Sequence, residues 1–546
     1  MKRWHQCILC RDSLVPQQSV RVLRNAMKAF SLLLTLAVTT QPARGQETQS
    51  ETGQLGDVYR EAPNALNLNV LPKRETPPKQ WLWASGEELA VLLVGTVWYW
   101  RNMEFNSRDW DLAWDQVSWK KKLVTFEALR FDSNDFYTNS VSHSRAGTVY
   151  YQAARANGLT AGESVLMNAA TTVLWEYAVE FKEVPSINDM IVNVGAGWTI
   201  GEPMYQLSQY FRRGRATTFN RVMAYALSPF GMLDDSIHRR SWHQQDGVDD
   251  YGMSVGRWHR FEVGLGTMTS NSSDSTEPNN MALGFDAALV MLKGYERPYA
   301  FSQWTAPGAW TGLRGFWSFA NQDTLTAARF STDVSVLGYY AQNFSNDEHI
   351  QLRGSGVFLG LGSGFDYNTR YLPGRWDRAT RLDLIGPRFE WVGAAGGLKL
   401  RLHAAAAVGF AMVDSLPFKA QSAQGDVGST NDMKSTMGAY GYYYARSLST
   451  DARLALEYRW FDVRASGRLS DYSSIQGRDR FEERINDDYL MFDRRTTLRL
   501  DLGVRPGKGP FRISGRLEQN FRKGQFNEST LNEEDRQALL GLGVIF

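Results

Sequence analysis

Hydrophobic and polar positions alternate with a period of two from about residue 256 to the C-terminus. Leu498, Leu500 and Leu502, for example, are separated by the charged residues Arg499 and Asp501. Successive side chains of a β-strand point to opposite faces, so this pattern indicates strands with one apolar and one charged face. We predict about twelve strands of this kind. They lie near 258–268, 281–292, 310–320, 328–341, 350–362, 380–392, 396–412, 435–448, 451–464, 489–505, 510–523 and 536–546.

Strand length and loop pattern favour a membrane barrel over a soluble sandwich, which also alternates. Soluble strands cluster near about 5–6 residues. The predicted strands have about 10 or more, which is the length a tilted strand needs to cross a bilayer. Short turns also alternate with long polar segments, as periplasmic turns alternate with extracellular loops. The short turns are predicted at 393–397, 449–450 and 506–510, and the long segments at 413–434, 465–488 and 524–535.

The last strand ends on the alternating apolar residues Leu540, Leu542, Val544 and Phe546. This ending resembles the signal of bacterial outer-membrane proteins that the barrel-assembly machinery reads. A closed barrel is also the only sheet that pairs every backbone group within lipid. We therefore expect residues 251–546 to form a β-barrel in the outer membrane of a Gram-negative bacterium. Its expected partners are the assembly machinery, outer-membrane lipid and lipopolysaccharide.

Residues 81–250 have a helical pattern instead. Leu89–Trp100 is an apolar run shorter than the ~20 residues of a transmembrane helix, so a buried or interfacial helix is expected there. Two further helices are predicted over 161–182 and 186–211. The second opens with Ser186 and Asp189, at the spacing of a helix N-cap. The chain is thus predicted to be an α+β membrane protein, with a helical domain that is either a plug in the lumen or periplasmic.

The N-terminal segment has the features of a secretory signal. From Met27 a basic residue, an apolar run and small residues before Gln46 follow in order. We predict that residues 1–45 are a signal peptide, with the true start at Met27, and that 46–80 are a polar, Pro-bearing linker. Cleavage would remove Cys7 and Cys10, the two cysteines of the chain. Disulfides and thiolate metal sites are then excluded from the mature chain.

The helical region carries a series of motifs. Trp175-Glu176-Tyr177 with Glu180 is followed by Pro185-Ser186-Ile187-Asn188-Asp189 and by Gly201-Glu202. This series resembles a domain-of-unknown-function family of bacterial envelope proteins over roughly residues 125–235. Ser228-Pro229 stands where the family would have Asn-Pro. The resemblance implies fold and envelope location but no activity.

Two roles are considered for the polar residues of this region. Glu176 and Glu180 are spaced for one helix face, and His143 is a candidate general base that one of them would orient. The favoured role is structural: these carboxylates would pair with inward arginines of the barrel and so seat a plug. Those arginines are Arg453, Arg459, Arg499, Arg512 and Arg516. A wider binding or structural cluster comprises Arg155, Asn157, Glu163, Asn188, Asp189, Asn193 and Glu202.

Several chemistries are excluded. A net charge of +2 gives no basic excess for binding nucleic acid. Gly195, Gly197 and Gly201 do not have the spacing of a dinucleotide fingerprint, and Asp132-x-Asn134 lacks the glycine of a calcium loop. We therefore expect no cofactor and no metal. The function expected is a plugged channel or an envelope-organising protein without enzymatic activity. The alternative is an outer-membrane hydrolase acting on lipid or lipopolysaccharide.

Overall fold

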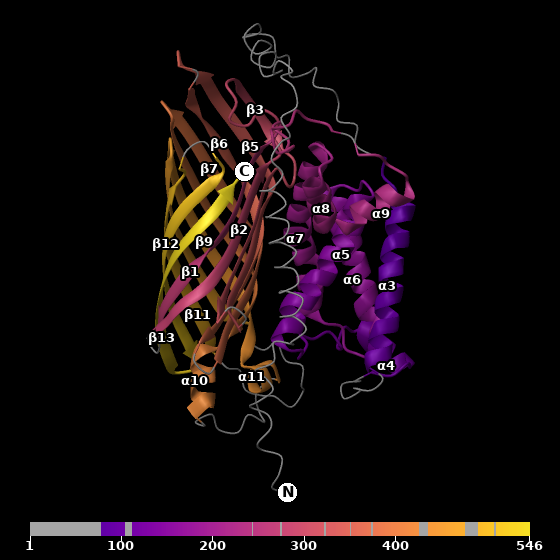
Figure 1. The fold of residues 1–546 in the computed structure, drawn as a ribbon. Helices are drawn as coiled ribbons and strands as arrows, with labels where there is room; N and C mark the ends of the chain where they lie inside the picture. The colour runs from indigo at the N-terminus through magenta and orange to yellow at the C-terminus, as the bar shows by residue number, and fades with distance from the viewer. Residues whose placement is uncertain are drawn as a thin grey trace.

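The computed structural model describes residues 78–103, 112–242, 244–272, 276–321, 324–349, 351–372, 375–424, 435–475, 490–506 and 509–546. The predicted signal peptide and nearly all of the predicted linker lie outside these residues. Figure 1 shows two parts standing side by side, a bundle of helices and a barrel of strands.

The bundle contains seven described α-helices and two π-helical turns. The helices are α3 Trp81–Met103, α4 Gln116–Leu123, α5 His143–Ala156, α6 Ala161–Leu174, α7 Ile187–Arg213, α8 Thr218–Leu227 and α9 Pro229–Ile237. The π-helical turns are η2 Thr138–Ser142 and η3 Trp175–Val179. The helices predicted near 161–182 and 186–211 are confirmed, and Ser186 caps α7 by accepting from the Asp189 backbone N–H. Among the helices described, none has both the length and the apolar character needed to cross a membrane.

Twelve strands close an antiparallel barrel, as predicted. They are β1 Trp258–Ser272, β2 Thr276–Val290, β4 Trp310–Ala320, β5 Thr324–Asn346, β6 Leu352–Leu372, β7 Arg375–Ala395, β8 Leu398–Asp414, β9 Tyr442–Tyr458, β10 Phe461–Ser474, β11 Met491–Val504, β12 Phe511–Phe526 and β13 Ser529–Ile545. The ring closes where β13 pairs with β1. A short extra strand, β3 Ala300–Thr305, pairs with the part of β5 that lies beyond β4.

Two predicted loop positions were wrong, and a third, 465–488, was predicted to begin too early, because β10 continues to Ser474. The turn expected at 449–450 lies inside β9, and the chain turns instead after Tyr458, where Arg459 has a positive φ. Ser449 stays in the strand, and its hydroxyl donates to the Asp383 carboxylate. The polar residues at 449 and 450 therefore belong to β9 and do not form a turn. The long loop expected at 524–535 is replaced by a turn at Asn527, because β12 and β13 continue beyond their apolar stretch with polar side chains on both faces.

The inward faces of the strands hold charges that pair within the barrel. Arg453 pairs with Asp451 at 2.6 Å, Arg499 with Glu518 at 2.7 Å and Arg516 with Asp501 at 2.6 Å. Arg512 likewise pairs with Asp462 and Glu262. Arg459 differs, since it lies in the turn with its guanidinium over the Tyr458 ring. The carboxylates expected from the helices are therefore supplied by neighbouring strands.

The helical domain packs against the outer wall of the barrel. Gly195 of α7 contacts Leu382 of β7, and Thr332 of β5 donates to the Thr199 carbonyl oxygen at 2.6 Å. Arg381 precedes Leu382 in β7, and Asp333 follows Thr332 in β5. Both of these charged side chains point into the lumen, where they form ion pairs. Residues on opposite sides of a strand lie on opposite faces of the wall. The predicted plug is thus corrected, because α7 covers the outside of β4 to β7 (Figure 1).

Candidate functional site

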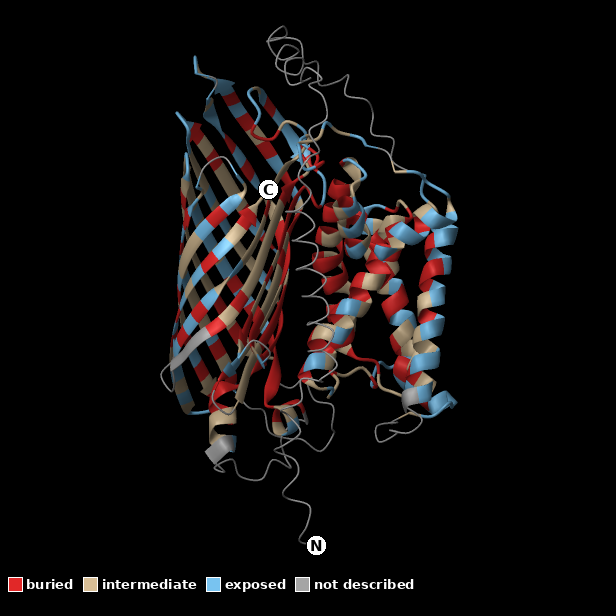
Figure 2. Ribbon diagram, in the orientation of Figure 1, coloured by how far each residue is buried: buried red, intermediate tan, exposed pale blue. Residues whose placement is uncertain are grey.

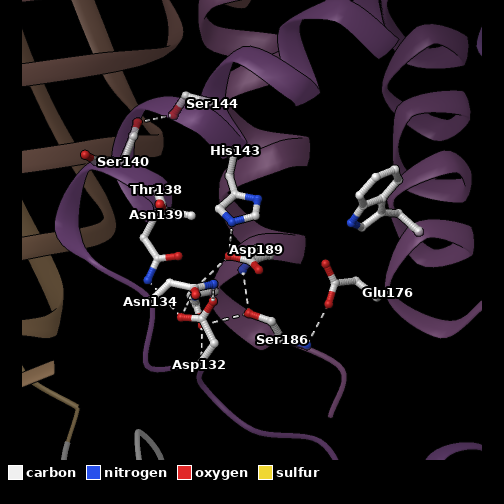
Figure 3. A network of polar contacts seen from close by, with 12 residues as sticks. Asp132, Asn134, Thr138, Asn139, Ser140, His143, Ser144, Glu176, Ser186 and Asp189 are labelled. Carbon is white, nitrogen blue, oxygen red and sulfur yellow. Dashed lines mark hydrogen bonds and ion pairs between the residues drawn. The ribbon is translucent and has the colours of Figure 1, made fainter. Parts of the chain in front are cut away.

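A polar cluster lies where the helical domain meets the outer face of β9. It is built from the segment that precedes η2, from the start of α5 and from the first turn of α7. The side chains converge on Asp132 and His143 (Figure 3). Several of the residues proposed from the sequence meet here, and two tyrosines of the barrel join them.

Asp132 is the centre of the hydrogen-bond network. Its Oδ1 accepts from Asn139 Nδ2 at 2.8 Å, from Asn188 Nδ2 at 3.0 Å and from the Tyr444 hydroxyl at 2.7 Å. Its Oδ2 accepts from Asn134 Nδ2 at 2.6 Å. A carboxylate that receives this many hydrogen bonds is held in one position. Asp132 therefore ties the helical domain to the barrel wall.

His143 faces Asp189, the residue that follows Asn188 in α7. Its Nε2 lies 3.2 Å from Asp189 Oδ1, and the two side chains are 16% and 3% exposed. Burial lowers the pKa of the His143 imidazole and raises the pKa of the Asp189 carboxyl, because desolvation disfavours the charged form of each. Both groups thus favour their neutral forms, and the pair is a close buried contact rather than an exposed ion pair.

Glu176 and Glu180 form a separate group. The Glu176 carboxylate accepts from the Ser186 backbone N–H at 2.8 Å, and Glu180 accepts from Trp175 Nε1 at 2.8 Å. Burial raises the pKa of Glu176 to about 8. The buried Lys122 donates to the Glu180 carbonyl oxygen at 2.9 Å. The orientation of His143 by a glutamate was expected from the sequence, but Asp189 is the carboxylate that contacts it.

Two other candidates from the sequence, Arg155 and Glu202, lie in α5 and α7, away from the cluster around Asp132. Arg155 of α5 makes two bonds to Glu202 of α7, at 2.8 and 3.0 Å. The Tyr151 hydroxyl and Gln206 donate to the same carboxylate. The four side chains form a fully partnered buried group between α5 and α7, and this supports a role in packing.

The remaining candidates also have structural contacts. Asn157 donates to Glu87 of α3 at 2.7 Å. Glu163 forms a capping box with Thr160 and pairs with Lys79. The Asn193 carbonyl oxygen accepts from Asn168 Nδ2 at 3.0 Å. These residues are spread along the bundle, so the structure divides the single cluster of the sequence analysis into separate groups.

The polar cluster around Asp132 and His143 could in principle support proton transfer or cation binding. Asp132, His143 and Asp189 each offer one ligand atom, and these atoms lie within 4.8 Å of one another. The Asp132 oxygens, however, already accept hydrogen bonds from asparagine and tyrosine side chains. The geometry therefore fits a His143–Asp189 pair, linked to Asp132 through the Asn188 amide, better than a metal centre.

Sequence reasoning missed the barrel side of the cluster. Tyr444 donates to Asp132, and Tyr442 donates to the Asn134 carbonyl oxygen. A signal for them existed, since both share the outward face of β9 and both follow Gly441 in a run of three tyrosines. Polar hydroxyl groups on an outward strand face indicate that part of this face packs against protein and not against lipid.

Comparison with protein families finds one match. Residues 128–230 match the model of the domain of unknown function DUF3943. The resemblance to a domain-of-unknown-function family is thereby confirmed: the chain carries a DUF3943 domain, followed by the closed barrel. Comparison with curated proteins finds no match.

Solved structures that resemble the chain are outer-membrane barrels. A loop-deletion mutant of OmpT, an outer-membrane protein of Vibrio cholerae, is 7% identical, with a TM-score of 0.20, over 53% of this chain and 100% of its own. An anion-selective porin from Comamonas acidovorans is 8% identical, with a TM-score of 0.21, over 53% and 99%. The outer-membrane protease OmpT from Escherichia coli is 10% identical, with a TM-score of 0.18, over 53% and 96%. At such scores the barrel assignment rests on the strand pairing described above.

Proposed function

We propose that this DUF3943-domain protein is an outer-membrane barrel whose lumen is a charged passage closed at both ends by its own segments. The proposal keeps the plugged channel expected from the sequence and assigns the closure to barrel loops. The observation that carries it is the lumenal cavity, which is lined by paired charges and by Tyr295 of an inserted segment, together with the packing of α10 against inward side chains of the barrel.

The central cavity has a volume of about 390 Å³ and is lined by barrel residues. Arg314 and Arg388 both pair with Asp333, at 2.8 and 2.9 Å. Arg464 pairs with Glu262 at 2.7 Å. Charges of both signs on facing walls would favour small polar solutes over apolar ones.

The segment between β8 and β9 closes one end. It contains α10 Leu416–Gln424 and α11 Ser435–Tyr440 (Figure 1). Phe418 of α10 packs against Phe526, with ring centroids 5.4 Å apart, and joins the inward residues Tyr443 and Met491 in one apolar cluster. Lys419 pairs with Asp414 at 2.8 Å. These contacts hold the segment in the mouth of the barrel.

The segment between β2 and β3 closes the other end. Tyr295 is buried among inward aromatic side chains, including Trp310 and Tyr340. The adjacent Glu296 pairs with Arg401 of β8 and with Lys399. The Tyr295 ring and the paired Glu296 carboxylate thus fill the lumen at the end of the barrel where the C-terminus lies.

The outward faces support the membrane location. Exposed apolar residues follow β12 from Phe511 through Ile513 and Leu517 to Phe521, and Lys523 lies beyond them. At a rise of ~3.3 Å per residue and a tilt of ~40°, this stretch is roughly 25 Å tall, which matches the apolar band of outer-membrane barrels. Placement there also implies the partners expected from the sequence, outer-membrane lipid and the barrel-assembly machinery.

Conductance in planar bilayers tests the closure. We expect the wild-type protein to be nearly silent. Because both ends are closed, the variants are made in a background in which Tyr295→Ala and Glu296→Ala vacate the other end. In this background Phe418→Asp should conduct and the unaltered Phe418 should not, because a carboxylate cannot remain in the apolar cluster that holds α10. A second variant, Leu416→Cys with Gly524→Cys, links α10 to β12 at a point where a Cβ at position 524 would lie 3.2 Å from Leu416 Cβ, close to the Cβ separation of a disulfide.

Combining the cysteine pair with Phe418→Asp gives the matched control. Oxidation should silence this variant and reduction should restore its conductance. Conductance of Phe418→Asp that is insensitive to oxidation of the pair, or a silent Phe418→Asp barrel that is folded, would contradict closure by α10.

A second candidate is the lipid hydrolase, which the His143–Asp189 pair favours because it lies on the outer side of the barrel wall. In this reaction a neutral His143 takes a proton from water, the oxygen of the water adds to an acyl ester, and a fatty acid and an alcohol leave. His143→Ala and Asp189→Asn should then leave the acyl chains of lipid A or phospholipid uncleaved, as measured by mass spectrometry of outer membranes. Glu163→Gln, far from this pair, is the control. Identical lipid profiles in all strains would eliminate this candidate.

A further inference from the structure

We infer that the exposed surface of α3 and α6 is a lipid-contacting surface, so that the helical domain lies beside the barrel with this one face, rather than any whole helix, against the acyl chains. The inference rests on the proposed membrane location of the barrel. It differs from the lumenal or periplasmic placement expected from the sequence.

The first observation is the inverted polarity of α3. From Trp81 to Trp98, its exposed residues within the described helix carry no charge. They are Trp81, Leu82, Trp83, Ser85, Gly86, Leu89, Ala90, Leu93, Val94, Val97 and Trp98. Its buried face instead contains Glu87 and Glu88, which are 8% and 3% exposed. A helix on the surface of a water-soluble domain has the opposite arrangement.

The same inversion occurs on α6 and in the π-helical turn that follows. Leu166, Val173 and Leu174 are 71%, 44% and 54% exposed. The residues facing inward are Ser164, Asn168, Thr171, Thr172 and Glu176, each at most 4% exposed. Polar side chains that face the interior of a bundle, with apolar side chains outside, are the pattern of helices in lipid.

Aromatic residues mark both ends of the apolar surface of α3. Trp81 and Trp83 lie at its start, and Trp98 and Trp100 lie near its end. The interval from Trp81 to Trp98 is about 25 Å at ~1.5 Å per residue, close to the height of the apolar band on the barrel. Lys79 and Arg101 flank this interval. Tryptophan and basic residues at such positions are typical of the two interfaces of a membrane.

The surface is continuous with the barrel wall. Where α7 covers the barrel, the wall presents apolar residues such as Phe261, Leu313 and Leu382, and the polar Thr332 is bonded to the Thr199 carbonyl oxygen of α7. Where no helix covers it, apolar residues such as Leu500 and Leu517 are exposed. The helices therefore replace part of the apolar wall and present a new one outside, with α3 as the outermost helix (Figure 2). Acyl chains that surround the barrel would meet this surface next.

Spin-label accessibility in phospholipid vesicles tests the inference on the full chain. Cys7 and Cys10 are first replaced by Ser, and nitroxides are then attached at Leu93→Cys and Leu166→Cys. Leu500→Cys on β11 is the reference for a site in the apolar outer face of the barrel. Glu348→Cys, in the turn between β5 and β6, is the reference for a site exposed to water. Heat-modifiable mobility in gel electrophoresis checks that each labelled barrel is folded.

We expect collisions with oxygen to exceed collisions with a water-soluble nickel complex at Leu93, Leu166 and Leu500, and the reverse at Glu348. Labels that contact lipid at Leu500 but water at Leu93 and Leu166 would overturn the inference and leave the barrel in the membrane. The apolar surface of α3 and α6 would then be a surface for docking of a protein. Water at Leu500 as well would instead refute the membrane location itself.

Discussion

Gly195 of α7 lies directly against Leu382 of β7. A Cβ atom at position 195 would fall 2.2 Å from Leu382 Cδ2, closer than non-bonded carbon atoms approach. The absence of a side chain at this point lets a helix rest on the outer wall of the barrel. The position of the helical domain thus depends on a contact between one helix and one strand.

Gly195→Leu should push α7 away from the wall. Overpacking of this kind costs about 1–3 kcal/mol, which corresponds to roughly 5- to 150-fold faster amide exchange where opening of α7 limits it. Hydrogen exchange followed by mass spectrometry measures this over residues 190–205. Gly86→Leu is the matched control, since a Cβ there meets no atom within 4 Å. Equal exchange in the two variants would show that α7 does not press on β7.

Tyr444→Phe should loosen the segment around Asp132. The hydroxyl donates to Asp132 at 2.7 Å, and its loss leaves a buried carboxylate one donor short, at a cost of about 1–3 kcal/mol. Tyr443→Phe, one residue earlier and facing the lumen, is the control, because its hydroxyl has no hydrogen-bond partner in the described part of the chain. Proteolysis of the segment 131–142 in vesicles should be faster only in Tyr444→Phe.

Arg495→Met should destabilise the barrel. Arg495 pairs inside the lumen with Asp493 at 2.9 Å and with Asp377 at 3.0 Å. Removal of one partner from a buried ion pair costs about 3–5 kcal/mol. The temperature at which the barrel unfolds in detergent should therefore fall, as heat-modifiable gel mobility measures.

Arg494→Met tests the same chemistry on the other face of the same strand. Arg494 pairs with Asp471 at 2.7 Å with its side chain 51% exposed, and exposed pairs contribute little. An unfolding temperature close to that of the wild type is expected. A larger decrease for Arg494→Met than for Arg495→Met would mean that the two faces are reversed.

The barrel was predictable because lipid and lumen impose opposite demands on alternate residues. Leu498, Leu500 and Leu502 face outward, while Arg499 and Asp501 face charges inside, and this contrast is visible in the sequence. The prediction was wrong where the contrast ends. Residues such as Lys523 and Asn532 continue β12 and β13 with polar outward side chains, so they were interpreted as a loop.

The position of the helical domain was not predictable in the same way. Carboxylates such as Glu176 and inward arginines suggested complementary charges, but each group finds partners within its own domain. Which side chains meet, within the helical domain as well as between it and the barrel, depends on packing. The His143–Asp189 contact, for instance, requires the start of α5 to lie beside the first turn of α7.

The helical domain should lose stability as the pH rises. Burial raises the pKa of Glu176 from 4.5 to about 8, so the folded state binds a proton that the unfolded state has lost between these values. Stability from this group is fully present below about pH 4.5 and is lost as the pH rises through about 8. The melting temperature followed by circular dichroism at 222 nm should therefore fall between pH 5 and 9.

Glu176→Gln should remove part of this dependence, because the amide oxygen still accepts from the Ser186 N–H but does not titrate. Glu180 and Asp189, whose pKa burial also raises, should keep the remainder. Glu163→Gln is the control, since hydrogen bonds lower the pKa of this exposed carboxylate to about 2, outside the range. A pH profile unchanged by Glu176→Gln would mean that another buried group is responsible.

Disulfide formation between α7 and the barrel tests most directly that the helical domain stands outside the lumen. In Gly195→Cys with Leu382→Cys, the new Cβ at 195 lies 3.1 Å from the position of Leu382 Cγ, where the second sulfur would be, a separation that suits a disulfide. The comparison is Gly195→Cys with Arg381→Cys, in which the second cysteine faces the lumen. We expect mass spectrometry of oxidised protein in vesicles to find the disulfide-linked peptides in the Leu382→Cys variant and not in the Arg381→Cys variant. Linkage in the Arg381→Cys variant in preference to the Leu382→Cys variant would contradict the arrangement and return the helices to the barrel interior.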